Sequence, residues 1–142
     1  MNKNTAVSAN NAEIIFLNRE HRDFYYLALE KAGSYDIYLK ALLYCLGIDK
    51  DTRRHICAIY DFDERIVKPD CLQEAWITSG SARVIRMALN LYCNGAPSVD
   101  QNAKKTDIIR EYECYTPEDL FCCGYARYFW QAIRLRYPEY CG

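Results

Sequence analysis

The run Thr52-Arg53-Arg54-His55, which directly follows Asp51, is the densest cluster of side chains in this chain that could do chemistry. An imidazole beside a carboxylate and guanidiniums could act as a general acid or base in a small hydrolase or nuclease, with His55 at its centre and Arg53 and Asp51 as its neighbours. The same residue types also begin helices and pair with each other on helix surfaces. The cluster therefore leaves a catalytic and a structural interpretation open.

Helical spacing divides this cluster into two faces. Thr52 and His55 recur with Ile56 at positions i, i+3 and i+4, which predicts that they point into the protein. Arg53 and Arg54 follow an aspartate by four and three residues, the spacing at which surface ion pairs form. Two neighbouring guanidiniums could instead bind a phosphate or the carboxylate of a partner, because their planar geometry suits bidentate contacts. We therefore expect a histidine that supports the core and arginines on a charged surface.

Two further features suit binding to a macromolecule. The segment from Cys71 to Cys93 resembles a helix-turn-helix, in which Arg83 and Arg86 could contact nucleic acid. Such binding would have to be local, because the net charge of −1 provides no overall positive field. Tyr137 and Tyr140 lie near the end of the chain, and tyrosine is favoured where one side of a ring is buried and the other is wet. A protein partner is thus favoured, and nucleic acid is the alternative.

Motifs for common enzyme chemistry are missing from the sequence. It contains no glycine-rich phosphate loop, no GxSxG, no HExxH and no calcium-loop pattern. Its two histidines would need carboxylates to complete a metal site, and no spacing in the chain demands one. The eight cysteines include no CxxC pair, so neither a zinc site nor a reactive dithiol is expected. These observations favour a non-enzymatic protein without a metal or a cofactor.

The first thirteen residues indicate in which cellular compartment the protein is expected. They are polar and rich in asparagine, with neither an apolar signal core nor helical periodicity. We therefore expect a disordered arm over residues 1–13 and a cytoplasmic protein with reduced thiols. No association with a membrane is expected, because no apolar run is long enough to span one.

Helical periodicity and clear stop signals organise the rest of the chain. One compact all-α domain is expected over residues 14–142, because this length can build a single core. The domain is predicted to be a bundle of about six helices. They run from Asn18 to Ala32, from Asp36 to Leu46, from Asp49 or Asp51 through Ile59, from Cys71 to Trp76, from the residues after Thr78-Ser79-Gly80-Ser81 to Cys93, and from Thr116 to about Arg136. Residues 98 to about 112 are the most polar interior stretch and are predicted to form an exposed loop.

The apolar positions of these helices predict what each one contributes to the core. The helix that begins at Asp36 is apolar nearly all round, so it is expected at the centre of the bundle. In the first helix, Leu27 and Ala28 are predicted to face inward, and His21 to be partly buried at the edge. In the last helix, Gln131 is predicted to lie outside.

Several strings occur in an order that resembles a known family of small proteins. They are Ala41-Leu42-Leu43-Tyr44-Cys45-Leu46-Gly47-Ile48 with Thr52-Arg53, Trp76-Ile77-Thr78-Ser79-Gly80-Ser81, Leu89-Asn90-Leu91-Tyr92-Cys93-Asn94-Gly95, Leu120-Phe121-Cys122-Cys123 and Arg136-Tyr137-Pro138-Glu139-Tyr140. Over about residues 16–140 the chain resembles an uncharacterised domain-of-unknown-function family that is commonly encoded on mobile genetic elements of gut bacteria. The resemblance implies no catalytic residue and no cofactor. It does imply a setting in which small cytoplasmic proteins regulate transfer or block host defences.

These observations predict a compact all-α protein that acts by binding a macromolecular partner. The most specific version of this prediction is an inhibitor of a host defence complex, similar in role to anti-CRISPR proteins. This version depends on the genomic setting that the family resemblance implies. One alternative is a nucleic-acid-binding regulator that uses Arg83 and Arg86 within residues 71–93. The other alternative is a small hydrolase or nuclease centred on His55.

Overall fold

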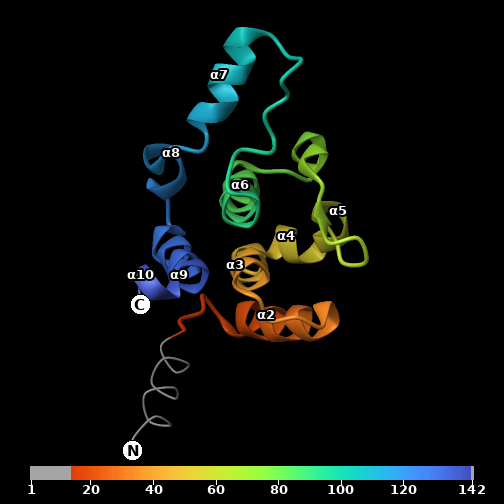
Figure 1. The fold of residues 1–142 in the computed structure, drawn as a ribbon, viewed down its shortest axis with the longest axis vertical. Helices are drawn as coiled ribbons and strands as arrows, with labels where there is room; N and C mark the ends of the chain where they lie inside the picture. The colour runs from red at the N-terminus through yellow and green to blue at the C-terminus, as the bar shows by residue number, and fades with distance from the viewer. Residues whose placement is uncertain (1–13, 142) are drawn as a thin grey trace, which may run out of the picture.

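The computed structural model describes residues 14–141, and this part of the chain is all-α (Figure 1). The predicted fold class is therefore confirmed, whereas the predicted arm, residues 1–13, lies outside the described residues. The longer helices are α2 (Arg19–Ala32), α3 (Ile37–Leu46), α6 (Ser79–Cys93), α7 (Lys105–Glu113) and α9 (Ala126–Arg136). The shorter elements are the helices α4 (Lys50–Arg54), α5 (Ile56–Ile59), α8 (Pro117–Phe121) and α10 (Pro138–Cys141), the 3-10 helix η1 (Pro69–Gln73), and the strands β1 (Tyr60–Asp61) and β2 (Ile66–Val67), which pair antiparallel.

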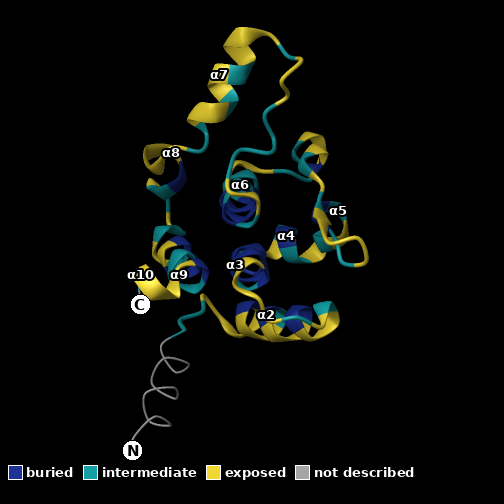
Figure 2. Ribbon diagram, in the orientation of Figure 1, coloured by how far each residue is buried: buried dark blue, intermediate teal, exposed yellow. Residues whose placement is uncertain are grey.

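The helix α3 lies at the centre of the molecule, as its apolar sequence predicts. Asp36 caps it by accepting a hydrogen bond of 2.8 Å from the Leu39 N–H. Leu39 and every residue from Ala41 to Leu46 are buried, because α2, α6 and α9 all pack against this helix (Figure 2). Full burial of one leucine side chain contributes roughly 1.5–3 kcal/mol. This one helix therefore supplies a large share of the hydrophobic stabilisation.

The helices α6 and α9 cover two further sides of α3 and are joined to each other by a buried arginine. Thr78 and Ser81 form a capping box that begins α6, and Asn94 ends this helix in the left-handed conformation with φ of 58°. Arg136, at the end of α9, is buried and donates to the Leu91 carbonyl at 2.9 Å and to the Asn94 side chain at 2.8 Å. These hydrogen bonds compensate the guanidinium for its lost hydration.

The segment before α2 is held by polar groups of the core. The Ile15 N–H donates to Gln131 Oε1 at 3.1 Å, and the Tyr44 hydroxyl donates to the Ile15 carbonyl at 2.5 Å. The prediction that Gln131 lies outside is wrong, because the side chain is buried where it satisfies this backbone group. The pairing joins residues that are far apart in the sequence, so helical periodicity could not predict it.

Two of the predicted helices are divided in the structure. The helix predicted through Ile59 breaks at His55, where the backbone leaves helical geometry (φ −107°, ψ 29°), and the new direction buries Ile59. The helix predicted from Thr116 breaks at residues 122–125, which include Gly124, a poor helix former. The brief helix predicted at residues 71–76 is the 3-10 helix η1. With α7 and α10 added, residues 14–141 form nine α-helices rather than about six.

The predicted exposed loop of residues 98–112 is irregular over residues 98–104, but from Lys105 onward it forms the helix α7. None of its side chains is buried, and it stands away from the other helices at one end of the molecule (Figures 1 and 2). Arg86 of α6 holds it by donating two hydrogen bonds to Glu111, at 2.7 and 3.0 Å, and Ser98 Oγ donates to the same carboxylate at 2.5 Å. The helix is held through a polar anchor and buries no side chain, so its position does not follow from a core-facing apolar stripe.

Candidate functional site

The residues of the proposed catalytic cluster do not assemble into a catalytic group. The His55 ring stacks on Trp76 with centroids 4.1 Å apart and planes within 4° of parallel. Its Nδ1 lies 3.0 Å from the backbone oxygen of Asp51, so the contact between these two residues does not involve the carboxylate. Thr52 is buried as predicted, with its hydroxyl donating to the Leu46 carbonyl at 2.5 Å, whereas His55 is half-buried and lies outside the core. Among residues 14–141, no group of three histidine, cysteine or acidic side chains could hold a metal ion.

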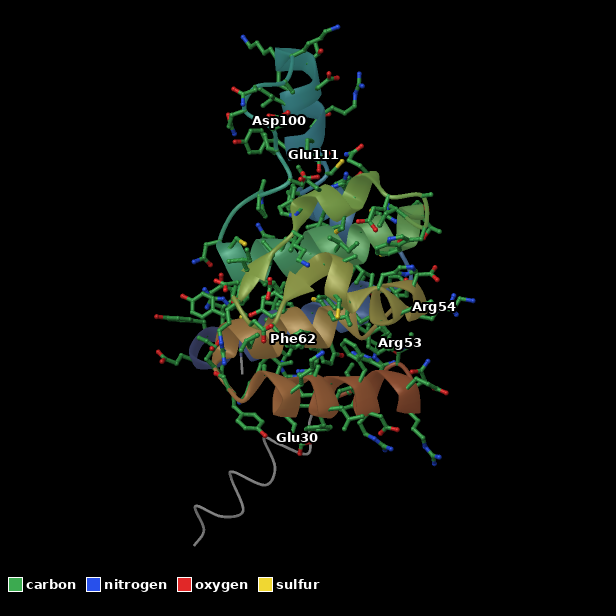
Figure 3. All side chains as sticks on the ribbon, turned by 90° about the vertical axis from the view of Figure 1, so that its right-hand side faces the viewer. Glu30, Arg53, Arg54, Phe62, Asp100 and Glu111 are labelled. Carbon is green, nitrogen blue, oxygen red and sulfur yellow. The ribbon has the colours of Figure 1, made fainter. Side chains whose placement is uncertain are left out.

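The arginines of the cluster do not form the predicted surface pairs. Arg53 Nη1 donates to the Gly47 carbonyl at 2.7 Å. Asp49, its expected partner, caps α4 and accepts a hydrogen bond from the Tyr125 hydroxyl at 3.0 Å. Arg54 is exposed and makes no ion pair within the described part of the chain, and Figure 3 shows it pointing away from the helices. The two guanidiniums are therefore separated: one lies against the fold and the other extends into solvent.

The other predicted binding residues lie in two separate places. Arg83 Nε donates to the Asp119 carbonyl at 2.7 Å, and Arg86 is paired with Glu111, so both guanidiniums already serve the fold. Tyr137 is partly exposed under the Arg136 guanidinium, which lies 4.6 Å from its ring centroid. Tyr140 is 83% exposed. The structure therefore does not bring the arginines of α6 together with the tyrosines into one site.

A polar pocket lies beside the anchor of α7. It has a volume of about 400 Å³ and is formed by η1, by α6 and by residues 97–100. Asp100 and Glu111, both labelled in Figure 3, lie on its α7 side. Arg86, Glu111 and Ser98 satisfy one another across its wall. The side chains of Arg86, Ser98 and Glu111 thus already have partners within the protein.

The helix α2 carries a surface that the sequence did not predict. Leu27, predicted to face inward, is 65% exposed. Beside it runs an open groove of about 200 Å³ between α2 and the segment from α5 to β1. The groove is lined by Phe24, Leu27, Ala28, Lys31, Ile56 and Phe62. Five of these six side chains are apolar, so the groove is suited to apolar atoms.

Basic groups lie at both ends of this groove. At one end, the Lys31 ammonium lies 4.6 Å from the centroid of the Phe62 ring. At the other end, Phe24 lies against Gly47, the residue whose carbonyl accepts the Arg53 guanidinium. Figure 3 shows Phe62 and Arg53 on the same side of α2. Arg53, a predicted binding residue, therefore lies next to a groove that includes Leu27 and Ala28, which periodicity assigned to the core.

A buried histidine fixes the position of α2 against α3. Asn18 caps α2 by accepting from the His21 N–H at 2.8 Å. The His21 ring is 0% exposed: the Leu17 N–H donates to Nδ1 at 3.1 Å, and Nε2–H donates to the Tyr44 carbonyl at 2.8 Å. Burial lowers the pKa of His21 to about 4, against a weaker opposite effect of the hydrogen bond to Tyr44. The ring is therefore neutral at pH 7, and the prediction that it lies at the edge of the helix is wrong.

The fold and this surface define a small all-α protein with an open apolar groove. The chain belongs to the DUF6075 family, a family of unknown function, which it matches over residues 11–142. No curated protein and no solved structure matches the chain. The resemblance to an uncharacterised family is therefore confirmed, whereas the link to mobile genetic elements of gut bacteria stays a prediction. Within residues 14–141, no helix combines the length and the apolar character needed to cross a membrane.

Proposed function

We propose that this chain is a non-enzymatic protein-binding domain that holds an apolar segment of a partner protein in the groove beside α2. The main observation that supports this proposal is the exposure of Leu27. Its side chain is 65% exposed although it lies in the middle of a helix whose inner face is well packed. A partner that covers this side chain would gain about 1–2 kcal/mol from it alone.

The surroundings of Leu27 support a binding role over a structural one. Phe24, Ile56 and Phe62 are partly buried beside it, so the exposed leucine continues an apolar surface. Clusters of apolar side chains with a charged rim are typical of sites where a few residues carry most of the binding energy. Arg53 donates to the carbonyl of Gly47, next to Phe24 of the groove, and this position fits the expectation that it contacts the carboxylate of a partner.

A photo-cross-linking experiment tests the proposal. We would place a benzophenone amino acid at position 27 and, as a matched control, at position 109 of α7, where Ile109 is 48% exposed. Illumination in cells of the native host should join position 27, and not position 109, to one defined protein. Leu27→Asp should weaken capture of that protein at least about tenfold, as loss of a central apolar anchor does, while Ile109→Asp should leave it unchanged. Equal labelling from both positions, or capture that survives Leu27→Asp, would contradict the proposal.

The finer expectation is that the partner belongs to a host defence complex and that the protein acts on it in the cytoplasm. The implied genomic setting supports this expectation. Its test is the activity of a purified defence complex with and without this protein, using Leu27→Asp as the inactive control. Nucleic-acid binding through Arg83 and Arg86 stays the second prediction, and a mobility shift at low salt tests it.

A further inference from the structure

We infer that the segment held in this groove is an amphipathic helix whose apolar stripe has an acidic flank on one side and a basic flank on the other. This inference rests on the proposed function and adds the conformation and the charge pattern of the partner. Its first support is the spacing of the groove residues. Phe24, Leu27 and Lys31 stand about one turn apart along α2, so the lined surface extends about 10 Å along the helix axis. A partner with apolar residues at i, i+3 or i+4, and i+7 matches this period.

The walls of the groove decide between a helical and an extended partner. They consist of the side chains of Phe24, Leu27, Ala28, Ile56 and Phe62, together with the stem of Lys31, and these atoms offer no row of hydrogen-bond donors and acceptors. An extended segment bound there would leave backbone groups without partners in an apolar site, which is costly. A helix satisfies its own backbone hydrogen bonds and needs only apolar contacts. The groove therefore favours a helical partner.

The charges beside the groove lie on opposite sides of Leu27. Lys31 and Arg53 lie on the groove side, as the contacts with Phe62 and Gly47 show. Glu30 follows Leu27 by three residues and lies on the other side of α2, and Figure 3 shows it across this helix from Phe62 and Arg53. Neither Glu30 nor Lys31 makes an ion pair within residues 14–141. Both charges are thus available to a partner that covers Leu27.

The basic pair Lys31 and Arg53 and the single acidic residue Glu30 define the flanks of the partner helix. The flank that faces Lys31 and Arg53 has to be acidic, and the flank that faces Glu30 has to be basic. Turning the partner helix end over end exchanges its two flanks. The surface therefore selects flanks of opposite sign and leaves open in which direction the helix runs.

Three synthetic peptides of roughly four helical turns test this inference. All carry the same apolar stripe. One has an acidic and a basic flank, the second has two acidic flanks, and the third has two basic flanks. Their dissociation constants for the full chain are measured by fluorescence anisotropy. The mixed peptide should bind about threefold to tenfold more tightly than either uniform peptide at low salt, and the difference should shrink as salt is raised.

Two neighbouring charge reversals provide the matched controls. Glu30→Lys makes both sides of Leu27 basic, so the peptide with two acidic flanks should become the tightest ligand. Lys31→Glu makes the surroundings more acidic, so the peptide with two basic flanks should gain affinity. Both residues are exposed in the last turns of α2, and circular dichroism with a melting curve checks that each variant is folded.

The outcomes separate this inference from the proposed function. Equal affinity of all three peptides, with no change of preference in the variants, overturns the charge pattern while position 27 can still cross-link to a partner. Absence of binding by any peptide at millimolar concentration overturns the helical occupant. Loss of position-specific cross-linking, by contrast, overturns the proposed function itself.

Discussion

Lowering the pH should destabilise this protein through one residue, His21. The ring is fully buried, and burial lowers its pKa from 6.5 to about 4 in the folded state. The unfolded chain therefore binds a proton between pH 6.5 and 4 that the folded chain does not bind, so stability falls as the pH falls through this window. Protonation would also remove the acceptor for the Leu17 N–H.

The magnitude follows from the two pKa values. At pH 7.5 the histidine is mostly neutral in the unfolded chain, so the lowered pKa costs the free energy of unfolding almost nothing. At pH 5 the penalty is about 2 kcal/mol, and below pH 4 it approaches about 3 kcal/mol, because each pKa unit is worth about 1.4 kcal/mol. For a domain of this size, a loss of about 2 kcal/mol is a large fraction of the total stability.

Urea unfolding at several pH values between 7.5 and 5 measures the effect. The control is His21→Gln, which cannot titrate but keeps an amide near the Tyr44 carbonyl. At pH 7.5 the free energy of unfolding of this variant should be about 1–2 kcal/mol below that of the native chain, because the Leu17 N–H loses its acceptor. The variant should then lose less stability on acidification than the native chain. Parallel pH profiles of the native chain and His21→Gln would refute the reasoning.

Two further perturbations test the packing of α2 and the anchor of α7. Gly47→Ala should cost about 1–3 kcal/mol in urea unfolding, because its Cβ would lie 2.8 Å from the buried imidazole and 2.9 Å from Phe24. Gly124→Ala, which has no atom within 4 Å of its Cβ, should change stability by less than about 0.5 kcal/mol; equal losses at the two glycines would contradict the packing argument. Glu111→Gln removes the charge that Arg86 pairs with and should speed tryptic cleavage within α7 several-fold, with little change in the melting temperature. An unchanged cleavage rate would show that other contacts hold this helix.

The parts of the fold that depend on local patterns were predictable. The apolar run of α3 and most of the helix α6 follow from periodicity, and the structure has them where the sequence places them, except that α6 already begins at Ser79. The interruption at His55 and the burial of Gln131 depend on partners distant in the chain. No single-helix pattern contains that information. The helix α7 was missed because the segment is strongly polar overall and buries no side chain, and the ion pair with α6 that holds it joins residues distant in the chain.

The candidate site was only partly predictable. Arg53 was predicted to bind from its type and position; in the structure its guanidinium donates to the carbonyl of Gly47, the residue that Phe24 of the groove lies against. Leu27 was assigned to the core because it follows Phe24 by three residues and precedes Ala28. Helical periodicity shows which residues share a face, but the width of the covering elements decides how much of that face is buried. Here α5 and β1 leave the edge of the face uncovered.

The stack of His55 on Trp76 has a consequence for spectroscopy. The chain has two tryptophans, and in the folded state the Trp76 ring lies parallel to the His55 imidazole, with the ring centroids 4.1 Å apart. The second, Trp130, is 51% exposed on α9 and lacks such a stack among the ring contacts of the described residues. The exposed Trp130 should therefore emit at long wavelength in the folded state. Unfolding separates the Trp76 ring from the His55 ring, so the emission of Trp76 should change and give the protein an internal optical signal for the loss of the α4–α5 region.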